Sequence, residues 1–253
     1  MLEPTNTYKD RIYELDTLGQ YTIGAFDIYV RGDINGDLSK LSDRDLGTFV
    51  HEYVHFLQNI TTLYGIYEGI IRNNAIAEMK KSYQDELEIQ IPYQYPYDKY
   101  QKEFRDFLIE SAGTGYVDVE IDRTRDISLE IEELSGYHKV LYHVHCKCYD
   151  TEGKLLDIIV GSTIIMEYMA VLCQSFVEHD MPDHPDVPYN VLDILCEKIF
   201  PNIAHDKKKL IYLCYFSLFD LNPGYSLMHV MKYAHMNPSV SGIDILLKKW
   251  LWQ

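Results

Sequence analysis

The chain has 253 residues, of which 47% are hydrophobic and 25% charged, and this composition predicts a folded protein with a substantial buried core. Its 39 acidic side chains outnumber the 23 basic ones, so the formal net charge is −16 at pH 7. Because such a charge repels phosphate backbones, we expect no nucleic-acid partner.

The apolar stretches and the cysteines indicate where the protein works. The N-terminal sequence MLEPTNTYKDRIYELD has no apolar core of the kind that secretory signals carry. The longest apolar tract, 155–173, is interrupted by two acidic residues and a Gly-Ser pair, so we expect no membrane association. The five cysteines lack the spacing of a zinc knuckle or a redox pair. We therefore expect reduced cysteines in a cytoplasmic protein.

The first half of the chain has a helical pattern after one short strand. We predict a strand at 25–30 and a helix that Ser42 or Asp43 caps and that runs to about Gln58. Further helices are predicted at about 62–84 and 99–111. Between them, the prolines of IPYQYPYDKY predict a Tyr-rich loop, which either packs its own aromatic rings on the surface or covers a binding site.

The second half begins with strands and ends with helices. YVDVEID and ISLEIEEL alternate apolar and polar residues, and VLYHVHCKCYD-TEG-KLLDIIV is typical of a hairpin. From Ser162 the pattern is helical, with breaks at 181–188, near Pro201, at 222–224 and around 237–238. The order of elements predicts an α+β fold, mainly helical with a small antiparallel sheet. We expect one domain over 1–253, or two lobes at 1–115 and 116–253.

The stretch TFVHEYVHFLQ at 48–58 contains the pattern H-E-x-x-H. His51 and His55 are four residues apart, so on a helix both imidazoles lie on one face and can bind a single Zn²⁺. Glu52 lies one step around the helix, close to that metal without being needed as a ligand. Its carboxylate can take a proton from a water molecule and pass it to a leaving amine.

The neighbours of this motif support a buried active-site helix. Glu52 is the one charged residue between Gly47 and Ile60, whereas an ordinary amphipathic helix carries charges on its outer face. The alternative is a buried helix whose histidines hydrogen-bond to the backbone. On this motif the chain resembles the HExxH zinc metallopeptidases, or zincins. It does not follow the metzincin pattern, because Gln58 and Thr61 stand where that group has a glycine and a third histidine.

In the gluzincin-like zincins the third ligand is a glutamate on a later helix, and here the resemblance points to Glu167. This residue is a lone carboxylate in the apolar stretch STIIMEYMAVLCQSF. Burying an unpaired carboxylate costs several kcal/mol, so we expect it either to bind a cation or to pair with an Arg or Lys. Thermolysin-like members have an aspartate four residues beyond this glutamate, where this chain has Val171. We therefore look to Asp180 or Asp220 to orient a histidine.

Other polar side chains compete for the ligand role. Glu178 shares a helix face with Glu167, but its polar neighbours predict exposure to solvent. His143 and His145 share one face of a strand with Lys147, which predicts a polar exposed surface rather than a metal site. His179, His184 and His205 lie in polar, loop-like segments.

Peptide hydrolysis also needs a hydrogen-bond donor for the oxyanion of the tetrahedral intermediate. Zincin-like enzymes often take a Tyr or His from a region after the third ligand, and the segment NPGYSLMHVMKYAH has that place here. Its position just before a helix favours Tyr225, and His229 lies one turn later on the same face. The same segment also contains Tyr233 and His235.

The sequence thus predicts a zinc metallopeptidase with a protein or peptide substrate. His51, His55 and Glu167 are the expected Zn²⁺ ligands, Glu52 the general base, and Tyr225 and His229 the oxyanion donors. The alternative is a catalytically inactive or regulatory protein-binding module on a zincin scaffold. A metal-dependent hydrolase acting on substrates other than peptides fits the same residues.

Overall fold

The computed structural model describes residues 18–23, 27–30, 37–85, 99–135, 140–181 and 183–244. The N-terminal stretch 1–17 and residues 91–98 of the predicted Tyr-rich loop lie outside these ranges. Among the helices of the described part, none combines the length and the apolar character that crossing a membrane requires.

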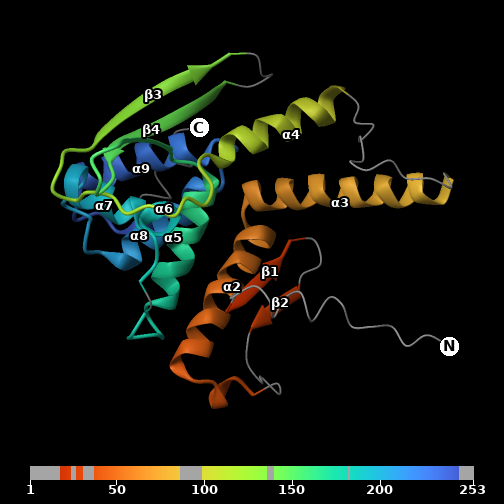
Figure 1. Ribbon diagram of the computed structural model, residues 1–253, viewed down its shortest axis with the longest axis horizontal. Coiled ribbons are helices and arrows are strands. Elements are labelled where there is room, and N and C mark those ends of the chain that lie inside the picture. Colours follow the sequence, from red (N-terminus) through yellow and green to blue (C-terminus); the bar gives the residue numbers. More distant parts are fainter. Residues whose placement is uncertain are drawn as a thin grey trace.

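The first half forms a helical group with a small hairpin at its side (Figure 1). Strands β1 (Gly19–Thr22) and β2 (Asp27–Val30) pair antiparallel, and both contact α2. A short 3-10 helix η1 (Leu38–Lys40) precedes the helices α2 (Asp43–Thr61), α3 (Leu63–Asp85) and α4 (Lys99–Ala112). The three predicted helices are confirmed, and β2 lies within the predicted strand; β1 was not predicted.

Local chemistry explains why α2 begins and ends where it does. The Ser42 side chain accepts a hydrogen bond from the Asp45 amide, and Asp43 and Asp45 place negative charge in the first turn. At the other end, the Thr62 amide and hydroxyl both donate to the Gln58 carbonyl. The start predicted from Ser42 is therefore confirmed, and the helix continues three residues past Gln58.

The second half opens with the antiparallel sheet β3-β4-β5, formed by Ser128–Leu134, Leu141–Tyr149 and Leu155–Ile159. These strands confirm the strand predicted for ISLEIEEL and the hairpin. The prediction for YVDVEID is wrong, because this segment joins no sheet. It makes two isolated bridges, Val117 with Val187 and Ile121 with Asp150. The Ile121 amide donates to the Asp186 carboxylate and is therefore not used to pair with a neighbouring strand.

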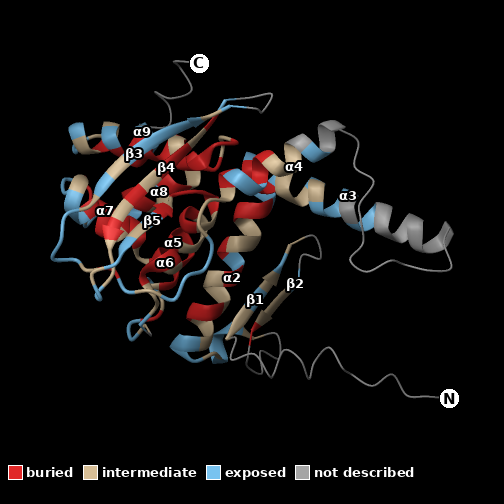
Figure 2. Cartoon of the chain, turned by 45° about the horizontal axis from the view of Figure 1, so that its top comes forward, coloured by how far each residue is buried: buried red, intermediate tan, exposed pale blue. Residues whose placement is uncertain are grey.

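The helices α5 (Ser162–Gln174), α6 (Asp186–Tyr189), α7 (Val191–Ile199), α8 (Lys207–Ser217) and α9 (Pro223–Met236) complete the described part. Helix α5 lies at the centre and packs against α2, α4, α6, α7, α8 and α9. Figure 2 shows the buried residues gathered along α5, α8 and α9 and under the sheet. The α+β fold, mainly helical with a small antiparallel sheet, is confirmed, and the α2–α5 contact positions the site.

Candidate metal centre

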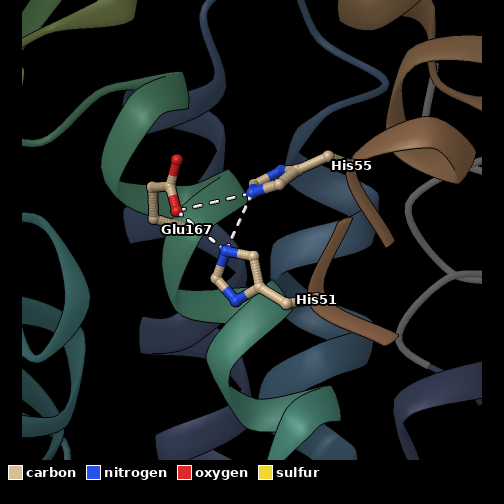
Figure 3. A group of neighbouring side chains, drawn as sticks. All are labelled: His51, His55 and Glu167. Carbon is tan, nitrogen blue, oxygen red and sulfur yellow. Dashed lines mark hydrogen bonds and ion pairs between the residues drawn. The ribbon is translucent and has the colours of Figure 1, made fainter. Parts of the chain in front are cut away.

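His51 and His55 of α2 and Glu167 of α5 point toward one another (Figure 3). The two Nε2 atoms are 3.1 Å apart, and they lie 3.3 Å and 3.4 Å from Glu167 Oε2. Tetrahedral Zn²⁺ with bonds of roughly 2.0–2.1 Å holds its ligand atoms about 3.3 Å apart, which matches all three distances. Within the described ranges, no other group of three or more His, Cys, Asp or Glu side chains has this closeness.

Two glutamines determine which nitrogen of each histidine faces the site. His51 Nδ1 lies 3.0 Å from Gln174 Oε1, and the Gln174 amide nitrogen donates to Glu178 over 2.7 Å. His55 Nδ1 lies 2.9 Å from Gln58 Oε1, whose amide nitrogen donates to the Met166 carbonyl. Because both amide nitrogens already donate, both amide oxygens must accept from Nδ1–H. A neutral imidazole held in this way has its lone pair on Nε2, the atom that faces Glu167, as metal ligation requires.

The electrostatics of this group favour a positive charge among its atoms. Burial opposes ionisation of Glu167, but the hydrogen bonds and charges of His51 and His55 hold its pKa well below the ordinary value. Burial likewise opposes a charge on His55, but Glu167 and Glu52 raise its pKa. A divalent cation supplies the same positive charge, so the donor set of two imidazoles and one carboxylate fits zinc.

Glu52 is buried beside the three candidate ligands and lines the same pocket. This pocket has a volume of about 570 Å³ and includes Glu52, His51, His55 and Glu167 in its wall. Burial raises the pKa of Glu52, and the two histidines oppose that rise. A carboxyl group held there, close to the candidate ligands without belonging to the triangle, is suited to transfer protons to and from a reacting group.

Two tyrosines at this pocket were not predicted. The hydroxyls of Tyr116 and Tyr189 hydrogen-bond to each other, and the ring of Tyr189 lies against that of His51. Burial raises the pKa of Tyr189, and Glu167 raises it further, so the hydroxyl keeps its proton and can donate a hydrogen bond. Asp186, at the start of the helix α6 that also carries Tyr189, accepts from the Ile121 amide over 2.7 Å and from Arg123 over 3.0 Å.

The predicted oxyanion donors lie elsewhere. Tyr225 stacks on Tyr142 of β4 with ring centroids 4.3 Å apart, and His229 packs edge-on against Tyr225 and is exposed. Neither residue belongs to the wall of the pocket. The reason is that α9 packs against β4 and α8, which directs this part of the helix toward the sheet. The structure therefore does not bring Tyr225 and His229 to the candidate centre, whereas Tyr116 and Tyr189 line its pocket.

The structure also shows where the other polar residues considered as ligands or orienting groups lie. Glu178 is 3% exposed and hydrogen-bonds to Gln174, so the prediction that it faces solvent is wrong. His143 is also buried and contacts the Glu110 carbonyl, whereas His145 lies between Asp157 and Glu132 on the sheet surface. The two histidines of the centre are oriented by glutamine amides, and not by the expected Asp180 or Asp220.

His184, which was assigned to a polar loop, lies 4.7 Å from Tyr189 between ring centroids. Its Nε2 atom is buried without a hydrogen-bond partner, and burial lowers the pKa of this histidine. His184 thus packs against the ring of Tyr189 and does not belong to the group of three candidate ligands. No local sequence signal marks this contact, because it depends on the position of the Tyr189 ring.

Comparison with known proteins identifies no relative: no protein-family model, no curated protein and no solved structure matches the chain. Functional inference therefore depends on the geometry of the centre itself.

Proposed function

We propose that this protein is a zinc-dependent metallopeptidase in which His51, His55 and Glu167 bind the metal and Glu52 is the general base. The observation that carries the proposal is the triangle of two Nε2 atoms and one carboxylate oxygen, with sides of 3.1, 3.3 and 3.4 Å. Both histidines are oriented by amide oxygens, so the lone pairs that would bind a cation are aimed at one point.

When bound, zinc polarises a carbonyl oxygen and lowers the pKa of water to about 7. Three protein ligands leave one position of a tetrahedral ion open for such chemistry, which distinguishes a catalytic site from a structural one. The centre is also accessible, since its residues line a pocket and are not sealed within the core.

The side chains around the triangle have separate tasks. Glu52 accepts a proton from the attacking water and delivers it to the nitrogen of the leaving amine. Tyr189, with Tyr116 bonded to it, donates a hydrogen bond to the oxygen of the peptide carbonyl as negative charge develops there. Gln58 and Gln174 keep the two imidazoles in the required tautomer.

The test compares zinc-loaded wild type with Glu52→Gln on a library of peptides, with metal content measured for both. We expect about one zinc per chain in each protein, cleavage by the wild type, and a loss of at least about 100-fold in kcat for Glu52→Gln. Glu152→Gln is the matched control, because Glu152 is exposed in the turn before β5 and absent from the pocket wall.

Full activity in Glu52→Gln would overturn the mechanism. Zinc binding without cleavage of any peptide would instead favour the protein-binding module or a hydrolase with another substrate. Failure of the wild type to bind zinc at all would contradict the metal assignment.

A further inference from the structure

Strand β1 lies along α2 at the position of Glu52. Gly19, Gln20 and Tyr21 line the pocket together with the candidate ligands, and β1 contacts both α2 and β2. The backbone of Tyr21 faces the Glu52 carboxyl group and favours its charged form, against the larger effect of burial, which raises the pKa of Glu52. The strand therefore lies directly beside the proposed general base.

Gly19 permits the close approach of that strand. A Cβ atom at this position would lie 2.6 Å from Thr48 Cγ2, 2.9 Å from Glu52 Cγ and 3.1 Å from Glu52 Oε1. The first two distances are shorter than carbon atoms tolerate, and neither atom is the free end of a long side chain. Thr48 cannot readily turn away, because its hydroxyl donates to the Arg44 carbonyl over 3.0 Å.

The side chain of Tyr21 secures the other end of the contact. Its hydroxyl donates to Asn59 Oδ1 over 3.1 Å, and its ring packs edge-on against Phe56 at 6.1 Å between centroids. Asn59 is itself buried and donates to the Gly65 carbonyl, so the acceptor is fixed by the junction of α2 and α3. Tyr21 thus spans α2 from Glu52 to Asn59.

We propose that β1 is a positioning element for Glu52, in which Gly19 allows the strand to reach the helix and Tyr21 holds the carboxyl group beside the metal ligands. This inference rests on the proposed role of Glu52 as general base. Without the strand, a Glu side chain rotates among several rotamers, and only some of them place the carboxyl group at the reacting atoms. Gly19 and Tyr21 act through Glu52 and need not touch the substrate.

The first experiment measures kcat, KM and zinc affinity for Gly19→Ala. An added methyl group moves either the strand or Glu52, so we expect kcat to fall about 100-fold while KM and zinc affinity stay close to those of the wild type. Gly69→Ala is the matched control, because its Cβ would lie at an ordinary 3.7 Å from Asn59 Oδ1. Unchanged kcat in Gly19→Ala, or a parallel loss of zinc affinity, would overturn the proposal.

A milder variant guards against misfolding of Gly19→Ala. Tyr21→Phe removes the hydroxyl bond to Asn59 and leaves the backbone of the strand beside Glu52 unaltered. We expect kcat to fall about fivefold, as the loss of one neutral hydrogen bond predicts, again with little change in KM. An effect confined to KM would mean that Tyr21 binds substrate, and would contradict a positioning role.

Amide hydrogen exchange in the metal-free protein separates this inference from the proposed function. If Glu52 accepts from the Tyr21 amide, Glu52→Ala and Gly19→Ala both accelerate exchange of that amide by at least about tenfold, and Gly69→Ala does not. Unchanged exchange in Glu52→Ala would refute the contact even if the protein proves to be a peptidase. Accelerated exchange in a protein without peptidase activity would retain the contact and reject only the catalytic role.

Discussion

Replacing Gln174 with Met tests the orientation of the proposed metal ligands. Methionine has a side chain of similar length to glutamine but no amide group. The substitution therefore removes the acceptor 3.0 Å from His51 Nδ1 and the donor 2.7 Å from the Glu178 carboxylate. Loss of such an orienting partner weakens metal binding about 10- to 100-fold, or roughly 1.4 to 2.7 kcal/mol. Since Gln174 and Glu178 are both buried, the metal-free protein also loses about 1.5–3 kcal/mol of stability.

Zinc affinity is measured by competition with a chromophoric chelator, and stability by urea unfolding of the metal-free protein. Gln174→Glu is the informative partner variant, since it keeps an acceptor for His51 but places a second carboxylate beside Glu178. We expect Gln174→Glu to retain zinc affinity and to lose stability, whereas Gln174→Met loses both. Wild-type zinc affinity in Gln174→Met would refute the idea that this amide orients a metal ligand.

Three further predictions concern the pocket, a turn and three cysteine thiols. Tyr189→Phe should lower kcat about 100-fold without changing zinc affinity. Tyr225 lies outside the pocket, so Tyr225→Phe should leave kcat unchanged. Equal losses of kcat in steady-state assays of the two variants would contradict the proposed role of Tyr189. Gly153 has a φ of 86°, so Gly153→Ala should reduce the free energy of unfolding by about 1 kcal/mol in urea titrations and leave zinc affinity intact; an unchanged unfolding midpoint would contradict this. Burial raises the pKa of Cys173 to about 11 and raises the pKa of Cys196 and Cys214 as well, so iodoacetamide at pH 8 should label these thiols slowly until the protein unfolds, as mass spectrometry can follow. Rapid labelling of the buried Cys196 or Cys214 in the native protein would contradict this prediction.

Local signals were sufficient for the helix that carries the motif. The capping residue Ser42, the spacing of His51 and His55 and the scarcity of charge around them all act within a few residues of one another. Glu167 could also be predicted from the sequence, because an isolated carboxylate in an apolar helix needs a partner wherever the chain folds. The structure brings it to within 3.4 Å of both histidines.

The partners of these residues could not be predicted, because they depend on packing between distant segments. Gln174 lies far from His51 in sequence and meets it only through the contact of α2 with α5. With 22 tyrosines in the chain, nothing local distinguishes Tyr116 and Tyr189, which the turn anchored by Asp186 brings together. Tyr225 was favoured for its place at a helix start, but the packing of α9 against β4 directs it away.

The short strand β1 also lacked a sequence signal. Its four residues, GQYT, contain a glycine and no apolar alternation, so they resemble a turn. The strand forms because it pairs with β2 and because Gly19 fits closely against Thr48 and Glu52. Alternating apolar and polar residues predict a strand only where its side chains are buried on one face. Strand β1 depends instead on main-chain pairing and on the close fit of Gly19, which leave no such pattern.

A crystal structure of the zinc-loaded protein, with anomalous diffraction recorded on both sides of the zinc absorption edge, tests the central claim most directly. We predict one zinc ion bonded to His51 Nε2, His55 Nε2 and Glu167 Oε2 at roughly 2.0–2.2 Å, with no fourth protein ligand. An anomalous peak at any other place, or a fourth side chain completing the tetrahedron, would contradict a catalytic zinc centre in this protein.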